Sequence, residues 1–334
     1  MINDFCLPIR PRRNRQSAWV RELLAETSLD SRDLIMPFFV IEGENKKESI
    51  DALPNQYRLS IDLLLKEVAR AKNLGICAIM LFPAIEKELK TKDGSEAYNS
   101  NNLICKAIKA IKTQIPEIGI ICDVALDPYT THSHDGLLSD CGRVLNDETI
   151  EILCQQALVQ AKSGCDIVAP SDMMDGRVGA IRQCLDKNGF ESVSIMSYCV
   201  KYASNFYGPF RNAIGSGQKT TVDKKTYQMD FRNSIEAQRE IALDIAEGAD
   251  MLIIKPGSLY LDIVAKAKQM CTLPIISYQV SGEYSMLKLA CNQGLLEFIP
   301  CLYETLIAFK RAGARAIISY GAIEMAEHLY QIPS

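Results

Sequence analysis

The chain lacks the patterns that would assign it to several common classes of protein. No apolar run approaches the ~20 residues that a membrane span requires, and the first residues lack the basic and apolar regions of a secretory signal. We therefore expect a cytoplasmic protein with no membrane partner. The formal net charge is only −4 over 334 residues, so nucleic acid is not an expected partner either.

Paired cysteines are also missing. The 12 cysteines are scattered, mostly within apolar stretches such as 75–79, and no two have the spacing CxxC. This favours the reduced, buried thiols of a cytosolic protein over a disulfide framework. In addition, no GxGxxG motif follows the first apolar run, which weakens the case for a nucleotide-binding sheet.

What the sequence does contain is a regular alternation of short apolar runs and amphipathic stretches. Nearly continuous hydrophobicity predicts strands that are buried on both faces. The eight runs are 34–40, 77–82, 119–126, 166–171, 193–198, 250–256, 274–280 and 314–321. Amphipathic stretches with helical periodicity lie between them, at 60–74, 147–163, 234–247, 259–271 and 303–312. Eight strands linked by helices favour an α/β fold, the TIM (β/α)8 barrel; an open doubly wound sheet is the alternative.

Two segments depart from a minimal barrel. Residues 1–30 precede the first strand and predict an arm with a short helix around 17–26; its basic run is either a solvated surface or a subunit contact. That run consists of Arg10, Arg12, Arg13 and Arg15. Residues 31–334 would form the catalytic barrel. Within it, the glycine-containing segment 199–233 predicts an active-site lid.

Polar residues collect where the predicted strands end, which is the edge that carries the chemistry of such barrels. They are Asp123, Asp127, His132, His134, Asp135, Ser171, Asp172, Ser197, Tyr198, Lys201, Lys255, Tyr278, Ser281, Ser319 and Tyr320. Lys255 ends an apolar strand, where desolvation would favour a neutral, nucleophilic amine. A lysine paired with a carboxylate is the alternative.

Lys201 ends the neighbouring strand, so the two amines could lie together and depress each other's pKa. Alone, Lys201 could equally clamp a phosphate or a carboxylate. The loop 122–136 could hold a divalent ion through His132, His134 and flanking aspartates, or could be ordered by hydrogen bonds alone. Only one thiol, Cys122, is near, so a thiolate zinc site has little support.

Several long motifs in this chain resemble those of the porphobilinogen synthase (5-aminolevulinate dehydratase) family. They are MSYCVKYASNFYGPFR at 196–211, APSDMMDGR at 169–177, KKTYQMD at 224–230, EGADMLIIKPG at 247–257 and YQVSGEY at 278–284. The resemblance implies a TIM barrel with an N-terminal arm, in dimers that assemble into homo-octamers. It also implies a lyase of tetrapyrrole (heme) biosynthesis that condenses two 5-aminolevulinates to porphobilinogen with loss of two waters.

The resemblance also implies roles for individual residues. Lys255 matches the lysine that forms a Schiff base with the first-bound, P-side substrate, and Lys201 matches the lysine of the A-side. The A-side carboxylate clamp would consist of Arg211, Lys224 and Gln228. Ser281 and Tyr320 would bind the P-side carboxylate, and Ser171 and Asp172 would lie near the P-side amine. Tyr278 would also bind substrate, and the lid would include Phe206.

Departures from the family pattern concern metals. Ala125, Asp127 and Asp135 stand where zinc-dependent members have cysteines, so the chain resembles the aspartate-rich, zinc-independent branch. No catalytic zinc is expected; Asp127 and Asp135 would contact the A-side amine or hold Mg²⁺ or a monovalent cation such as K⁺. Glu240 matches the glutamate that binds an allosteric Mg²⁺, a chemically reasonable ligand.

Two other functions compete with this interpretation. One is a different class I, Schiff-base aldolase on the same barrel, which two rim lysines disfavour. The other is a non-catalytic assembly protein that has kept the fold, which the two intact lysines also disfavour.

Overall fold

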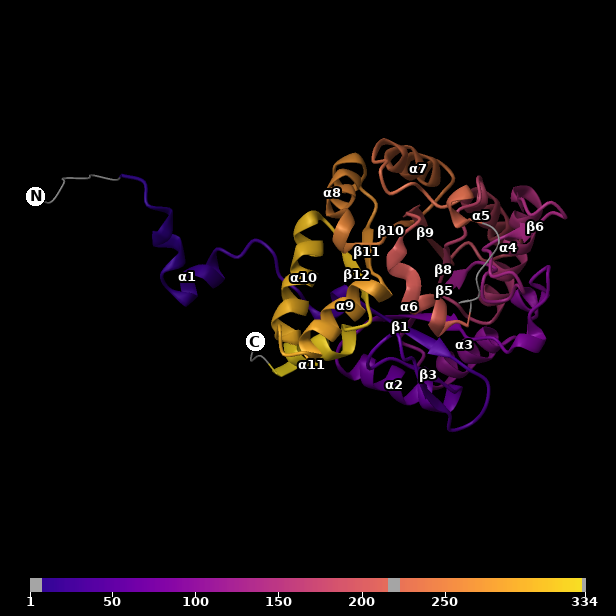
Figure 1. Ribbon diagram of the computed structural model, residues 1–334, viewed down its shortest axis with the longest axis horizontal. Helices are drawn as coiled ribbons and strands as arrows, with labels where there is room; N and C mark the ends of the chain where they lie inside the picture. The colour runs from indigo at the N-terminus through magenta and orange to yellow at the C-terminus, as the bar shows by residue number, and fades with distance from the viewer. Residues whose placement is uncertain (1–7, 216–222, 332–334) are drawn as a thin grey trace, which may run out of the picture.

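The eight predicted strands all form, and they close into a barrel (Figure 1). The computed structural model describes residues 8–215 and 223–331. The barrel strands are β1 (Leu34–Val40), β4 (Ala78–Pro83), β5 (Gly119–Val124), β8 (Ile167–Pro170), β9 (Ser194–Lys201), β10 (Met251–Lys255), β11 (Ile275–Gln279) and β12 (Ala316–Ser319). Each pairs in parallel with the next, and β12 pairs with β1. The TIM barrel is therefore confirmed, and the open sheet is wrong.

Helices surround the barrel. They are α2 (Ile61–Asn73), α3 (Leu103–Gln114), α4 (Asn146–Lys162), α5 (Arg177–Lys187), α6 (Gly208–Ala213), α7 (Ile235–Ala246), α8 (Leu261–Met270), α9 (Ser281–Asn292), α10 (Phe298–Ala312) and α11 (Ala322–Gln331). The predicted helix at 303–312 in fact begins at Phe298. Its first turn contains Pro300, a residue that is tolerated at a helix N-terminus because the backbone N–H there has no helical partner.

The apolar residues form two cores, one inside the barrel and one between barrel and helices. Along β4, Met80 and Phe82 belong to the inner cluster, whereas Ile79 and Leu81 belong to the outer one. Both faces of the strand are buried, which explains why the strands appear in the sequence as unbroken apolar runs.

Short strands that the sequence did not predict extend this frame. β2 (Lys47–Ser49) and β3 (Tyr57–Leu59) form an antiparallel hairpin, and β3 also pairs with the end of β1. β6 (Leu137–Leu138) and β7 (Val144–Leu145) form a second, separate pair. Two or three residues are too few to show a periodicity.

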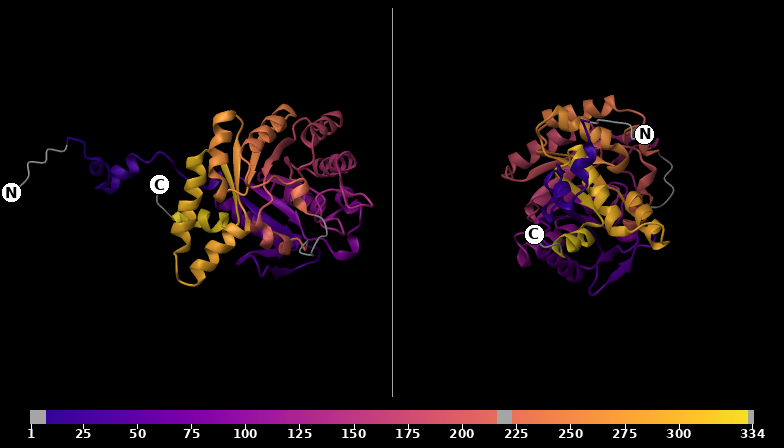
Figure 2. Two further views of the ribbon diagram at one scale, coloured as in Figure 1. Left: turned by 45° about the horizontal axis from the view of Figure 1, so that its top comes forward. Right: turned by 90° about the vertical axis from the view of Figure 1, so that its left-hand side faces the viewer.

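The N-terminal segment projects from the barrel (Figures 1 and 2). It contains a 3-10 turn, Pro11–Arg15, and the helix α1 (Ala18–Leu23), within the range expected for a short helix. Trp19 and Leu23 on α1 are about 70% exposed, at 69% and 73%. Among the described residues, no helix combines the length and the apolar character needed to cross a bilayer.

Candidate active site

Lys201 and Lys255 end adjacent strands and lie directly opposite each other in the ladder between β9 and β10. Their side chains are both buried, at 5% and 6% exposure. Together they line one small cavity of about 20 Å³. The cavity is completed by Asp127, Asp135, Tyr207, Phe210, Arg211, Lys224 and Gln228. The structure thus brings the two predicted lysines into one site.

Aromatic rings surround the amine of Lys255. Its Nζ lies 4.7–5.3 Å from four ring centroids, those of Tyr278, Phe210, Tyr198 and Tyr207. Burial, reinforced by the positive charge of Lys201, lowers the pKa of Lys255 to about 7. A substantial fraction of this lysine is therefore uncharged near neutral pH and can act as a nucleophile.

Lys201 has different surroundings, and here the expected mutual depression of the two pKa values fails. Its Nζ donates to Oδ1 of Asp135 at 2.9 Å and to the carbonyl oxygen of Ser171. Burial alone would lower the pKa of Lys201, but the charges of Asp135, Asp127 and Asp123 outweigh it and raise that pKa. Only Lys255 therefore has the lowered pKa that the sequence led us to expect of both.

Three carboxylates face the lysines and differ in charge state. Burial and the neighbouring Asp127 raise the pKa of Asp123 to about 7. Burial and the neighbouring Asp135 likewise raise the pKa of Asp127. For Asp135, the charges of Lys201 and Lys224 outweigh burial and hold the pKa well below its usual range. Asp135 is thus the fixed anion of the site, and Asp123 can exchange a proton near neutral pH.

The segment after β9 covers the cavity. The 3-10 turn Asn205–Tyr207, which contains the half-buried Phe206, leads into α6. Phe210 on α6 packs its ring against those of Phe39 and Phe82 of the barrel interior. Ser281 holds this segment, because its hydroxyl accepts from the N–H of Phe210 and donates to the carbonyl oxygen of Phe206.

The rest of the predicted lid supplies further polar groups. Lys224 donates to Oδ2 of Asp135 at 2.8 Å and lies 3.7 Å from Oδ2 of Asp127. The hydroxyl of Tyr227 also donates to Asp135, at 2.7 Å. Gln228 is buried, and its Oε1 has no hydrogen-bond partner in the described part of the chain. Residues 216–222 of this segment, including Lys219, lie outside the described residues.

Other expected residues lie around the rim or elsewhere. Tyr278 and Tyr320 are buried with hydroxyl oxygens 3.1 Å apart. Ser171 contacts Lys201 through its backbone carbonyl. The carboxylate of Asp172 faces Arg177, at the start of α5, and does not line the lysine cavity. Glu240 lies in a separate cavity of about 350 Å³ with Asp175 and Glu236, and Gln228 lines both cavities.

Sequence reasoning gave no specific role to several residues that the structure brings to the lysines, although it placed Asp123 and Tyr198 at the strand ends. Asp123 is one; its Oδ1 is buried without a hydrogen-bond partner among the described residues. A lone carboxylate within the apolar strand β5 was the available signal. The rings of Tyr207 and Phe210 carried no such signal, because aromatic residues in apolar stretches are ordinary core residues.

The described residues contain no group of three or more His, Cys, Asp or Glu side chains arranged to hold a metal ion. In the loop 122–136, Nδ1 of His132 accepts from the N–H of His134, and Nε2 of His132 lies 3.2 Å from the carbonyl oxygen of Lys92. Both ring nitrogens of His132 thus contact the protein backbone. This geometry favours a loop ordered by hydrogen bonds over a histidine metal site.

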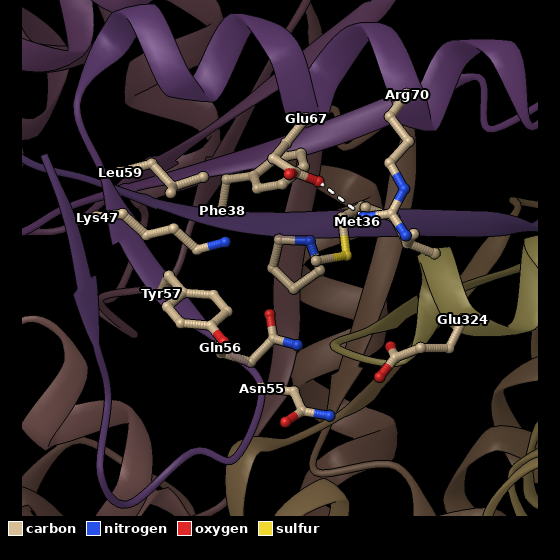
Figure 3. A pocket seen from close by; sticks show the side chains of 12 residues that line it. Met36, Phe38, Lys47, Asn55, Gln56, Tyr57, Leu59, Glu67, Arg70 and Glu324 are labelled. Atoms are coloured by element: carbon tan, nitrogen blue, oxygen red, sulfur yellow. Dashed lines mark hydrogen bonds and ion pairs between the residues drawn. The ribbon is translucent and has the colours of Figure 1, made fainter. Parts of the chain in front are cut away.

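A larger cavity, of about 200 Å³, lies on the outer side of β1 (Figure 3). Glu67 and Arg70 of α2 form an ion pair at its edge, and Glu324 faces it from α11. Gln56 connects it to the barrel, because its Nε2 donates to the backbone oxygen of Tyr320 at 3.0 Å. None of the expected site residues lines this cavity, so it is distinct from the lysine site.

A closed (β/α)8 barrel with two buried lysines at the carboxyl ends of adjacent strands defines a class of enzyme, one built for amine chemistry on carbonyl compounds. Comparison with known proteins identifies the family. The protein family described as "Delta-aminolevulinic acid dehydratase" matches this chain over residues 8–328. The delta-aminolevulinic acid dehydratase of Bradyrhizobium diazoefficiens is 54% identical over 323 residues, covering 97% of this chain and 91% of the relative.

The delta-aminolevulinic acid dehydratase of Chlamydia pneumoniae is 51% identical and covers 99% of both chains. In structure, the chain is similar to the delta-aminolevulinic acid dehydratase (porphobilinogen synthase) of Toxoplasma gondii, which was solved in complex with the reaction product porphobilinogen. The TM-score is 0.96 at 45% identity, over 98% of this chain and 96% of the other. The chain belongs to the delta-aminolevulinic acid dehydratase family, and it is an enzyme of the lyase type.

Proposed function

We propose that this chain condenses two molecules of 5-aminolevulinate to porphobilinogen, with loss of two waters, through imines on Lys255 and Lys201. The observation that carries the proposal is that both amines line one buried cavity. Because a lowered pKa leaves Lys255 partly neutral at physiological pH, this amine attacks the ketone of the first substrate. Loss of water then gives the imine, whose protonated form withdraws electrons from the neighbouring carbon.

Lys201 binds the second substrate. Its ammonium must lose a proton before it can attack a ketone, and Asp135 stabilises the charged form. Asp123, whose pKa is about 7 and whose charge interacts with both lysines, is the candidate proton acceptor. This assignment makes Lys255 the amine that reacts first, as the family resemblance implies for the P-side.

Charged and polar groups around the cavity are the proposed binding partners of the substrate carboxylates. Arg211 and Lys224 line the cavity beside Gln228, whose Oε1 has no partner in the described residues, and they form the proposed A-side clamp. Ser281 begins α9, where helix N–H groups favour an anion, and with Tyr320 and Tyr278 it forms the proposed P-side clamp. Ser171 lies beside the P-side amine. Asp172 does not line the cavity, and its proposed effect on the site is indirect, through its contact with Arg177.

The covering segment must move during each cycle. A cavity of about 20 Å³ has room for about one water and not for two substrates. Since Tyr207, Phe210 and Arg211 form one wall, we propose that the segment around α6, within 199–233, is the lid. Its closure excludes water and protects the imines from hydrolysis.

Borohydride trapping tests the proposed function. The enzyme is reduced in the presence of 5-aminolevulinate, and peptides carrying Lys255 and Lys201 are analysed by mass spectrometry. We expect adducts on both lysines, and porphobilinogen in a parallel colour assay. Adducts with other carbonyl compounds but no porphobilinogen would instead support a class I aldolase. No adduct on either lysine would refute the proposal.

We further propose that the enzyme is of the aspartate-rich type, without catalytic zinc. Ala125, Asp127 and Asp135 provide no thiolate, and the two carboxylates lie beside the ammonium groups of Lys201 and Lys224. This donor set does not fit zinc, which prefers thiolate and imidazole ligands. Glu240 lines a roomy cavity of about 350 Å³, and a single carboxylate there suits a largely hydrated Mg²⁺ as an allosteric ion; a monovalent cation is also part of the proposal.

The assembly is proposed to be a homo-octamer built from dimers, in the cytoplasm. The projecting arm exposes Ile9, Trp19 and Leu23, apolar surface of the kind that partner subunits cover. The cysteines of the described residues are free thiols, as suits a reducing compartment. Light scattering on the purified enzyme measures the assembly directly.

A further inference from the structure

The strand β9 contains an irregularity next to Lys201. Between the pairs Leu252↔Ser197 and Ile254↔Val200, β10 advances two residues while β9 advances three. One strand therefore carries an extra residue, which is a β-bulge. The side chains agree with this count, since Tyr198 belongs to the inner core whereas Cys199 and Val200, which follow it, both belong to the outer core.

The bulge decides where Lys201 points. In a regular strand, side chains alternate, so two residues three positions apart face opposite sides of the sheet. Tyr198 and Lys201 are three apart, yet the ring of Tyr198 and the amine of Lys201 both reach the barrel interior. Without the extra residue, Lys255 would pair with Val200 rather than with Lys201, and the amine of Lys201 would turn toward the helices.

A buried cation holds the strand at this point from outside the barrel. Arg177, the first residue of α5, is 2% exposed. Its guanidinium donates to the carbonyl oxygen of Tyr198 at 3.1 Å and to Oγ of Ser197 at 3.2 Å. Both acceptors belong to the residues with which the bulge begins. Arg177 thus contacts the backbone at the origin of the irregularity.

The cation is itself fixed by two carboxylates. Asp244 of α7 accepts from both Nη atoms of Arg177, at 3.1 and 3.2 Å, and its Oδ2 also accepts from Ser197 Oγ at 2.5 Å. The Oδ2 of Asp172 lies 3.7 Å from Nε of Arg177. Such two-pronged pairing uses the planar guanidinium fork, which a lysine cannot reproduce.

We infer that Arg177 is a positioning residue for the condensation: by holding the bulge in β9 with Ser197 and Asp244, it places the amine of Lys201 beside that of Lys255. The inference rests on the proposed function of the two lysines. The inference predicts a selective effect, because none of the hydrogen bonds of the Arg177 guanidinium described above reaches β10 or Lys255. Loss of the cation should therefore affect one lysine and spare the other.

The experiment compares Arg177→Lys with a matched control, Arg182→Lys. Arg182 lies on the same helix and also donates to backbone carbonyls, those of Val193 and Phe190, but at the opposite end of β9. Each full-length enzyme is assayed for kcat and KM and is then reduced with borohydride in the presence of 5-aminolevulinate. Adducts on Lys201 and Lys255 are quantified separately by mass spectrometry.

For Arg177→Lys we expect kcat to fall about 100-fold, the effect of displacing a reacting group by about 1 Å. The Lys201 adduct should fall with it, while the Lys255 adduct stays within about twofold of wild type, since only β9 is displaced. Arg182→Lys should retain both adducts. Ser197→Ala removes one hydrogen-bonding group without removing a charge and should act in the same direction, with about a tenfold loss of kcat.

Two outcomes overturn the inference. If both adducts fall in parallel in Arg177→Lys and in Ser197→Ala, the network only stabilises the fold. If both adducts and kcat stay at wild-type values in these two variants, the bulge does not depend on the network around Arg177. If Arg177→Lys does not fold, Ser197→Ala decides by the same two adducts. A wild-type enzyme without either adduct refutes the proposed function itself, which is a distinguishable result.

Discussion

Lys201 pairs directly with Lys255 across two parallel strands, yet the two amines have opposite electrostatic surroundings. Lys255 lies among four aromatic rings and has a pKa of about 7. Lys201 is bound to Asp135 and keeps a raised pKa. One site therefore holds a neutral amine and a charged one side by side, which gives the two substrates an order of reaction.

Replacing Lys255 by alanine should abolish porphobilinogen formation, because the reaction starts at its amine, whose pKa is lowered to about 7. The colour assay measures the rate, and circular dichroism checks that the variant is folded. Lys266→Ala is the control, since Lys266 is a partly exposed lysine on α8 that pairs with Asp262. A substantial residual rate in Lys255→Ala would refute the role assigned to this residue.

The lowered pKa of Lys255 has a consequence for stability. In the unfolded chain the lysine stays protonated up to about its ordinary pKa of 10.5, whereas in the fold it loses its proton near 7. Between these values the unfolded state binds more protons, so the free energy of unfolding of the wild type rises with pH. Lys255→Met removes this dependence. We expect the variant to be more stable, by on the order of a few kcal/mol below pH 7, and the difference to shrink as the pH rises toward 10.5.

Denaturant unfolding at several pH values between about 6 and 10 measures that difference. The same ionisation should appear in catalysis, because imine formation at Lys255 requires the neutral amine. The single-turnover trapping rate at Lys255 should therefore rise with pH through about 7. A trapping rate that does not change between about pH 6 and pH 8 would contradict the assigned pKa.

Asp135→Asn should impair the reaction at Lys201 more than at Lys255. The amide keeps the shape but removes the anion that positions the amine of Lys201, so the buried Lys201 loses its ion pair and the partly buried Lys224 loses its nearer one. We expect kcat to fall about 10–100-fold and the protein to lose about 3–5 kcal/mol of stability. Asp127→Asn is the comparison, because Asp127 only approaches Lys224 at 3.7 Å, and its effect should be smaller. Equal effects of the two variants would argue against a special role of Asp135.

Removal of metal tests the proposed aspartate-rich type. After chelation, we expect Mg²⁺ to restore or raise activity, and Zn²⁺ alone to fail, because Ala125, Asp127 and Asp135 provide no thiolate. In Glu240→Gln, the Mg²⁺ concentration for half-maximal activation should rise by about tenfold or more, since the ion loses its charged ligand. Restoration by Zn²⁺ alone would overturn the assignment of Asp127 and Asp135.

The arm should be required for assembly. Replacing both Trp19 and Leu23 by serine removes exposed apolar surface without touching the barrel. We expect sedimentation to show a smaller oligomer at micromolar enzyme, as apolar interface contacts are lost. Leu295→Ser is the control, because Leu295 is equally exposed, at 75%, but lies in the turn between α9 and α10. An unchanged sedimentation profile of the arm variant would show that these two residues do not hold the assembly.

The barrel could be predicted from local sequence patterns alone. Strands buried on both faces must be apolar along their whole length, so all eight were visible as runs, and helices between them had to show the period of an amphipathic surface. The sequence also determined that Lys201 and Lys255 belong to one rim, because parallel strands in a barrel end on the same side. The family motifs around both lysines lie in the same segments.

The difference between the surroundings of the two lysines could not be predicted, because it arises from tertiary contacts. The charge state of each amine depends on neighbours from distant parts of the chain, such as Asp135 for Lys201 and Tyr278 for Lys255. The bulge that turns Lys201 inward is a one-residue difference in register between two strands, and Arg177 reaches it from another element. Coulomb energies and registers depend on distances in space, and those distances are fixed by packing that no local pattern encodes.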